Sequence, residues 1–160
     1  MKNVFINKNL LFIFALFLTL SCSKKSDEVT PTNLVGKWKD NGTVSKISGT
    51  DNGKAVSYDL STPASSLIVE FKNDGTALID GDVINYKLTG SILTLSVNGL
   101  SYDFTVSKVS ATELVLSLTK EQFYKYAPFA FDTLGNDYKL LQNIKTNAVV
   151  DHKETYLKQK

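Results

Sequence analysis

The stretch LSYDFTVSKV, residues Leu100 to Val109, alternates apolar and polar side chains along its length. Successive side chains of a β-strand point to opposite faces, so this alternation is typical of a strand with one buried and one exposed face. The apolar side chains expected on the buried face are those of Leu100, Tyr102, Phe104 and Val106. A strand of this kind belongs to an antiparallel sheet that covers a core on one side.

The same two-residue period recurs on both sides of this stretch. Apolar side chains alternate at Val56, Tyr58 and Leu60; at Leu67, Val69 and Phe71; at Ile84, Tyr86 and Leu88; at Leu93, Leu95 and Val97; and at Leu114, Leu116 and Leu118. Turn-forming pairs such as Asp80-Gly81 and Asn98-Gly99 lie between them and supply the positive φ angles of tight hairpins. The sequence therefore predicts an all-β fold, an antiparallel up-and-down β-barrel of about eight strands.

The pattern changes after Leu118. Residues 119–122 (TKEQ) have the form of a capping box, and apolar residues at helical spacing continue up to Pro128. This predicts a short C-terminal helix, with a further helical turn near residues 138–144. The tail at 154–158 is a candidate for the strand that closes the barrel.

The N-terminus has the three-part organisation of an export signal. Two lysines precede an apolar run at residues 10–20 (LLFIFALFLTL), and the small residue Ser21 precedes Cys22, the single cysteine of the chain. At about 1.5 Å per residue, a helix of this length would span roughly half of the ~30 Å hydrocarbon core. We therefore expect residues 1–21 to be a signal peptide rather than a transmembrane helix.

Residues 18–22 (LTLSC) resemble the bacterial lipobox, with Thr19 at a position where Leu is preferred. The resemblance implies cleavage before Cys22 and attachment of lipid to that cysteine, which holds a protein durably when two or three acyl chains are present. Residues 22–33 are polar and suit a flexible tether. Ser23 and the run KKSDE at 24–28 are similar to sorting signals that imply the outer membrane, at its periplasmic face or at the cell surface.

Composition excludes several classes of function. Beyond the leader, lysines and acidic residues balance, and the chain contains no Arg, whereas nucleic-acid-binding proteins concentrate positive charge and favour Arg. We therefore expect no nucleic-acid partner. The single cysteine excludes an internal disulfide. Residues 34–160 are thus predicted to form one domain that depends on its core alone.

Four segments of this domain resemble lipocalins. Gly36-Lys37-Trp38 is similar to the Gly-x-Trp that opens the first lipocalin strand. The segments FKNDGT (71–76), YKLTGSILTL (86–95) and TELVL (112–116) resemble those of bacterial lipocalin-like domains in exported lipoproteins. The resemblance implies a lipocalin (calycin-type) barrel with Gly36 and Trp38 as structural residues at its base. In lipocalins an Arg of the last strand commonly covers this Trp; here Lys153 or Lys158 substitutes, or the base is built differently.

The sequence contains no recognisable catalytic constellation. The single His, His152, lies near the polar C-terminal end, and we interpret it as a surface residue. Asp80 and Asp82 flank Gly81 without the spaced oxygen ligands of a calcium loop, and we interpret them as part of a hairpin turn. We expect no enzymatic activity, no metal and no cofactor.

Two functions remain open for the barrel. In the first, its interior is a cavity for a small apolar ligand, and residues 123–138 act as a lid. The residues expected to line that cavity are Tyr58, Phe71, Tyr86, Tyr102 and Phe104. In the second, side chains fill the core, and the protein is an interaction or structural module with a protein partner in the cell envelope.

Overall fold

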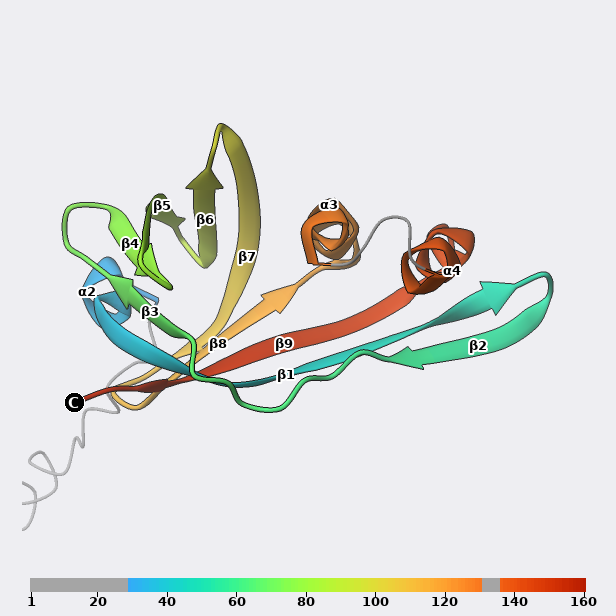
Figure 1. The fold of residues 1–160 in the computed structure, drawn as a ribbon, viewed down its shortest axis with the longest axis horizontal. Helices are drawn as coiled ribbons and strands as arrows, with labels where there is room; N and C mark the ends of the chain where they lie inside the picture. The colour runs from blue at the N-terminus through green and yellow to red at the C-terminus, as the bar shows by residue number, and fades with distance from the viewer. Residues whose placement is uncertain (1–28, 131–135) are drawn as a thin grey trace, which may run out of the picture.

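The computed structural model describes residues 29–130 and 136–160 (Figure 1). The predicted signal peptide, Cys22 and the tether up to residue 28 lie outside the described residues. The described elements are α2 (Pro31–Leu34), β1 (Gly36–Asp51), β2 (Lys54–Asp59), β3 (Ile68–Phe71), β4 (Thr76–Ile79), β5 (Asp82–Thr89), β6 (Ile92–Val97), β7 (Leu100–Val109), β8 (Glu113–Leu118), α3 (Lys120–Ala130), α4 (Asn136–Ile144) and β9 (Val149–Lys158). The last residues of the predicted tether, 31–33, thus belong to α2.

Eight of the strands close into an antiparallel barrel. Their order is β1-β3-β4-β5-β6-β7-β8-β9, and β9 pairs back with β1. At Asp80-Gly81 the φ angles are 51° and 94°, and at Asn98-Gly99 they are 49° and 78°, as tight hairpin turns require. The predicted all-β barrel is confirmed, and β9, which contains the predicted closing tail, closes it.

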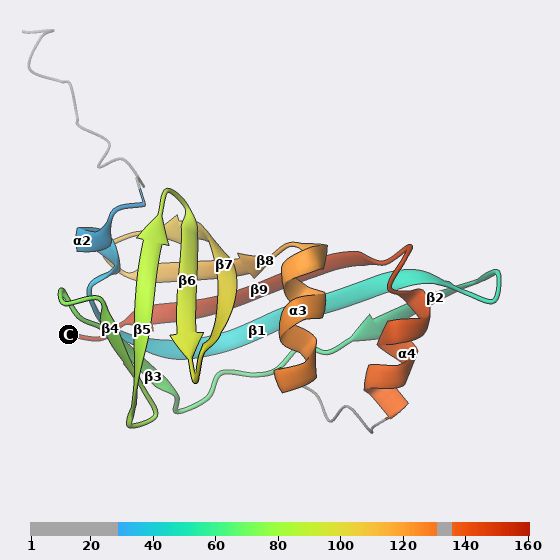
Figure 2. The ribbon, with the colours of Figure 1, turned by 90° about the horizontal axis from the view of Figure 1, so that it is seen from above.

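One predicted strand lies outside this ring. β2 pairs with the far half of β1, from Lys46 to Asp51, and residues 60–67 then lead the chain back to β3. Figure 2 shows β1 and β2 extending beyond the barrel as an arm, with the first residues of β9 paired to β1 at its start. The alternation at 56–60 correctly predicted a strand, but the place in the ring that we gave it is wrong. An alternating pattern indicates that one face of a strand is buried, but it does not indicate which element of the fold buries that face.

Helices α3 and α4 lie over the extension of the sheet (Figure 1). The predicted capping box is present, because the Thr119 N–H donates to Gln122 Oε1 at 2.8 Å and the Gln122 N–H donates to Thr119 Oγ1 at 3.3 Å. α3 continues past Pro128 to Ala130, farther than predicted, because a proline in the last turn removes few helical hydrogen bonds. The turn predicted near 138–144 is a helix of 9 residues.

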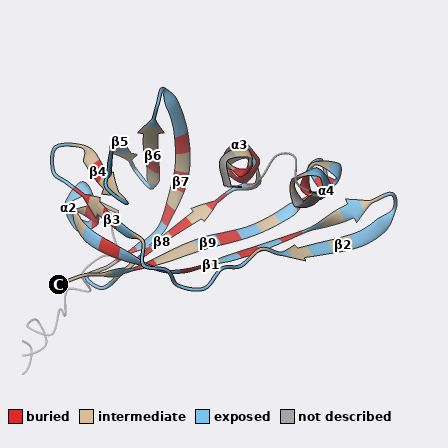
Figure 3. Cartoon of the chain, in the orientation of Figure 1, coloured by how far each residue is buried: buried red, intermediate tan, exposed pale blue. Residues whose placement is uncertain are grey.

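The helical layer packs closely on β1. A Cβ at Gly49 would lie 2.6 Å from Asn147 Oδ1 and 3.0 Å from Ile144 Cβ, so a glycine is required for this approach. The Asn147 side chain accepts from the Thr50 N–H at 2.7 Å and donates to the Thr50 carbonyl at 2.9 Å. Figure 3 shows buried residues both inside the barrel and where the helices face the sheet. The core therefore continues from the barrel into this second layer.

Trp38 forms the base of the barrel and is completely buried. Its Nε1–H donates to the Leu34 carbonyl in α2 at 2.7 Å. The Lys158 ammonium group from β9 lies 4.1 Å from the centroid of the indole ring and donates to the Val35 carbonyl. Burial lowers the pKa of Lys158. The lysine thus combines a cation–π contact with a hydrogen bond that links the first and last strands.

This arrangement explains the Gly-x-Trp sequence. A Cβ on Gly36 would lie 2.6 Å from Lys158 Nζ, so glycine leaves the space through which the lysine reaches the ring. Lys153, the other candidate, instead pairs with Asp151 on the surface at 2.7 Å. Lys158 therefore takes the position for which the resemblance implied an Arg.

Candidate ligand-binding site

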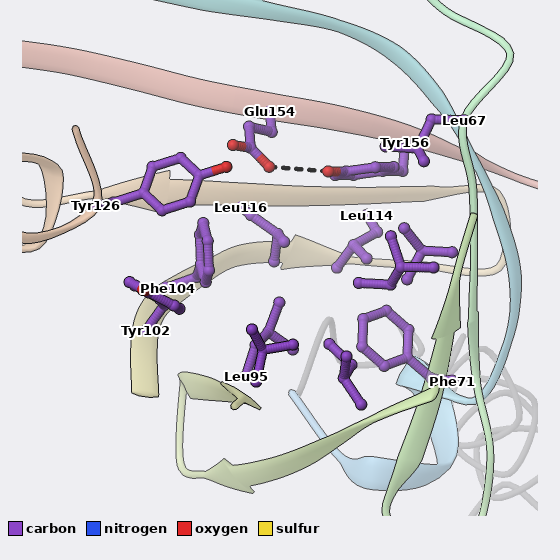
Figure 4. Close-up of a pocket in the computed structure, with 14 residues that line it drawn as sticks. Leu67, Phe71, Leu95, Tyr102, Phe104, Leu114, Leu116, Tyr126, Glu154 and Tyr156 are labelled. Atoms are coloured by element: carbon purple, nitrogen blue, oxygen red, sulfur yellow. Dashed lines mark hydrogen bonds between the residues drawn. The ribbon is translucent and has the colours of Figure 1, made fainter. Parts of the chain in front are cut away.

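The barrel encloses a cavity of about 300 Å³. Since a water molecule takes about 30 Å³ of liquid, this volume corresponds to about ten non-hydrogen atoms. It lies at the lower end of the range for small-molecule sites. Most of the wall is apolar, and its side chains include Val69, Phe71, Leu95, Phe104, Leu114 and Leu116 (Figure 4).

The two ends of the barrel differ. The base is closed by Trp38 and α2. At the opposite end, where the β4–β5 and β6–β7 hairpins turn, the wall residues Ile79 and Val97 are both partly exposed. α3 covers the side of this end next to β7, where the Tyr126 ring packs edge-on against Tyr102 and Phe104 with centroids 5.8 and 5.6 Å apart. A ligand would therefore enter beside the hairpin turns.

Three of the five residues expected to contact a ligand line the cavity: Phe71, Tyr102 and Phe104. Tyr86 lies beside the cavity rather than in its wall. Its ring packs edge-on against Phe71 at 5.1 Å, and its hydroxyl donates to a carbonyl of the β3–β4 turn at 2.6 Å. Tyr58 is on β2, outside the ring, and does not line the cavity.

The segment 123–138, expected to be a lid, divides between two environments. Tyr126 on α3 lines the cavity. Phe123 packs against β9 and Tyr124 donates its hydroxyl hydrogen to the backbone of α4 at 3.0 Å, so both belong to the layer between the helices and the sheet. The side chains of residues 129–137 lie outside the described part of the chain.

A carboxylate stands in this apolar wall. Glu154 on β9 is 14% exposed, and its Oε2 accepts from the Tyr156 hydroxyl at 2.8 Å. Its Oε1 lies 3.2 Å from His152 Nε2, and His152 Nδ1 lies 3.0 Å from Ser45 Oγ. Figure 4 shows the Tyr126 hydroxyl directed toward the same carboxylate from α3. The Glu154 carboxylate and the hydroxyls of Tyr126 and Tyr156 thus gather at one place on the wall.

The interpretation of His152 as a surface residue is wrong, because only 8% of it is exposed. The register of β9 places it opposite Ser45 on β1. Ser45, His152 and Glu154 are residue types that also occur in nucleophilic triads. Ser45 is 3% exposed and is not part of the cavity wall, however, so its hydroxyl has no space beside it for a reacting molecule.

Burial and the nearby Glu154 charge affect the tyrosines of the site. Burial raises the pKa of Tyr156 well above its ordinary value, and Glu154 raises it further. The pKa of Tyr126 is raised by burial first and by Glu154 second. Both phenols therefore keep their protons at neutral pH, and Tyr156 remains a hydrogen-bond donor to Glu154.

The raised pKa of Tyr156 predicts a loss of stability at alkaline pH. A group whose pKa is higher in the folded state contributes stability that is complete below its unfolded pKa, about 10 for Tyr, and that is lost as the pH rises through the folded value. We expect Tyr156→Phe to make the free energy of unfolding fall less steeply above pH 10, by up to about 1.4 kcal/mol per pH unit. Urea titrations of both proteins measure these slopes. Equal slopes would show that Tyr156 ionises alike in both states.

No protein-family model matches the chain, and no curated protein or solved structure shows a significant match. The class is therefore defined by the fold itself, a closed eight-stranded antiparallel barrel, which is consistent with a lipocalin-like fold. Within residues 29–130 and 136–160, no helix has the length and apolar character needed to cross a membrane.

Proposed function

We propose that this protein is a lipid-anchored envelope protein of the lipocalin-like type whose barrel binds a small, mostly apolar molecule. The observation that carries the binding is the cavity of about 300 Å³ with its apolar wall. An eight-stranded barrel is just wide enough either to be filled by side chains or to hold one small ligand. An apolar cavity hydrates poorly and is available to apolar ligands.

The anchor in this proposal is Cys22. It is supported by the apolar run at 10–20, the small residue Ser21 and the polar residues that follow the cysteine. Outer-membrane attachment places the cavity within reach of amphiphiles that leave a bilayer. The proposed role is non-enzymatic, with the barrel acting as a container.

Cavity size sets the expected affinity. A ligand of about ten non-hydrogen atoms carries on the order of eight methylenes, whose burial yields about 6 kcal/mol gross at ~0.8 kcal/mol each. Loss of translational and rotational freedom and ordering of the chain reduce this value. We therefore expect a Kd of tens of micromolar or weaker, since about 6 kcal/mol corresponds to roughly 40 μM before these costs.

Filling the cavity tests this proposal. Leu116 on β8 is buried and lines the cavity, whereas its neighbour Val115 points to the other face of the same strand. We expect Leu116→Phe to reduce the affinity for medium-chain apolar molecules about tenfold or more, because the added ring occupies the ligand's volume. Native mass spectrometry and tyrosine fluorescence of residues 23–160 measure binding.

Val115→Phe is the matched control, since it adds the same ring outside the cavity. It should leave affinity within about twofold of the unmodified protein, a change well below the 1.4 kcal/mol of a tenfold effect. If no apolar compound binds below about millimolar concentration, ligand binding is not the function.

The second candidate, a protein-interaction or structural module, is favoured by a different observation. Large apolar side chains are exposed on strand ends at the open end of the barrel, at Ile68, Val83, Val97 and Leu100. Exposed apolar groups in one region are typical of interaction surfaces. This candidate predicts that small apolar molecules do not bind and that Leu116→Phe changes only stability.

A further inference from the structure

We infer that the ligand of this cavity is an amphiphile with a cationic amine head group that binds Glu154, and that alkyl carboxylates of the same size are disfavoured. This inference rests on the proposed function and names the ligand class for the same site. It depends on the position of Glu154, on its remaining hydrogen-bonding capacity and on the charges around the cavity.

Glu154 is the charged residue of the described cavity wall, and the lysines nearest to it along β9 are directed elsewhere. Lys158 lies over Trp38 at the base, and Lys153 pairs with Asp151 on the outer surface. An alkyl carboxylate would therefore enter a site with a like charge and without a lysine in the described wall to balance it. Burying an unbalanced charge in apolar surroundings is costly, so the site disfavours anionic head groups.

Glu154 retains capacity to accept further hydrogen bonds. A carboxylate has about four lone-pair positions, and the described contacts use one on each oxygen, from Tyr156 at 2.8 Å and from His152 at 3.2 Å. An ammonium group has three donors. It can donate to a free position on Glu154, and the Tyr126 hydroxyl, which is directed toward the same place in Figure 4, offers a further acceptor.

The apolar part of the wall fits the other half of such a ligand. Leu95, Phe104, Leu114 and Leu116 surround the space below the carboxylate in Figure 4. With the head group at Glu154, a chain of about eight carbons accounts for the approximate ten-atom capacity of the cavity. The low polarity of this wall strengthens the charge-assisted hydrogen bond between the ligand's ammonium group and the Glu154 carboxylate.

The test uses three compounds with the same chain: octylamine, octanol and octanoate. Binding to residues 23–160 is measured by isothermal titration calorimetry below the concentrations at which the compounds form micelles. We expect octylamine to bind about tenfold more tightly than octanol, and octanoate to bind most weakly. Glu154→Gln should reduce octylamine affinity about tenfold and leave octanol within about twofold.

Glu70→Gln is the control variant. It removes the same charge from β3 at a residue that pairs with Lys37 at 3.8 Å and does not line the cavity, so all three affinities should stay unchanged. If the Glu154→Gln protein fails to fold, the order of affinities of the unmodified protein for the three compounds still tests the head-group inference. Equal binding of the three, or tightest binding of octanoate, overturns the head-group inference and leaves the proposed function intact. Failure of all three to bind overturns both.

Discussion

Trp38→Ala is expected to lower the free energy of unfolding by about 3–5 kcal/mol, the usual cost of truncating a fully buried large aromatic residue. The loss removes the ring beneath Lys158 and the donor to the Leu34 carbonyl, so the side-chain contacts from β1 to α2 and to the end of β9 are lost while the backbone pairing of β1 with β9 remains. Since the free energy of unfolding of a domain is only about 5–15 kcal/mol, this substitution removes a large part of the stability. Thermal and urea denaturation of residues 23–160 measure the change.

Val44→Ala provides the matched control on the same strand. Val44 is 47% exposed, so its truncation should change the free energy of unfolding by no more than about 0.5 kcal/mol. Trp38→Phe, which keeps an aromatic ring beneath the lysine, should fall between the two. A Trp38→Ala protein that melts within about two degrees of the unmodified protein would show that Trp38 does not hold the base together.

Cys22→Ser is expected to abolish acyl attachment, so that any protein whose leader has been removed is found in the soluble fraction. Serine lacks the thiol on which the thioether forms, and without acyl chains the anchoring energy of about 0.8 kcal/mol per buried methylene is lost. Growing cells with a tagged fatty acid and separating membranes from soluble fractions measure both effects. The variant should accumulate with its leader attached or as an unlipidated form.

Ser23→Ala is the adjacent control, and it should leave labelling and membrane attachment unchanged. Labelling of the Cys22→Ser protein at normal levels would place the lipid on another residue. Membrane attachment of an unlabelled protein whose leader has been removed would assign the anchoring to a protein partner instead.

The barrel strands could be predicted from the sequence because each presents one apolar face and ends at a turn with residues suited to positive φ. The arm could not be predicted, because Tyr58 alternates with polar neighbours in β2 just as Tyr102 does in β7. The difference between them lies in pairing: β2 contacts the far half of β1, while β7 lies between β6 and β8. Pairing partners are set by the whole chain rather than by a local period.

The polar residues of the cavity wall and of the barrel base could not be predicted from the sequence for a different reason. His152, Glu154, Tyr156 and Lys158 occur at every second position, which is the spacing of one strand face. Because all four carry an ionisable or polar group at the tip, a search for apolar periodicity treats this face as exposed. Glu154 bonds to His152 and Tyr156 on its own strand, whereas the contacts of His152 with Ser45 and of Lys158 with Trp38 form only once β9 lies against β1.

The seam between β1 and β9 also determines when this protein can fold. Lys158 bonds to the Val35 carbonyl across a separation of 123 positions, and β9 lies between β8 and β1 in the closed ring. Contacts of such long sequence separation are slow to form, because much chain entropy is lost before they contribute. Ring closure must therefore wait until the chain has been synthesised through Lys158. A nascent chain stopped before β9 keeps both edges of its sheet unpaired, which makes it a ready substrate for chaperones, proteases and export machinery.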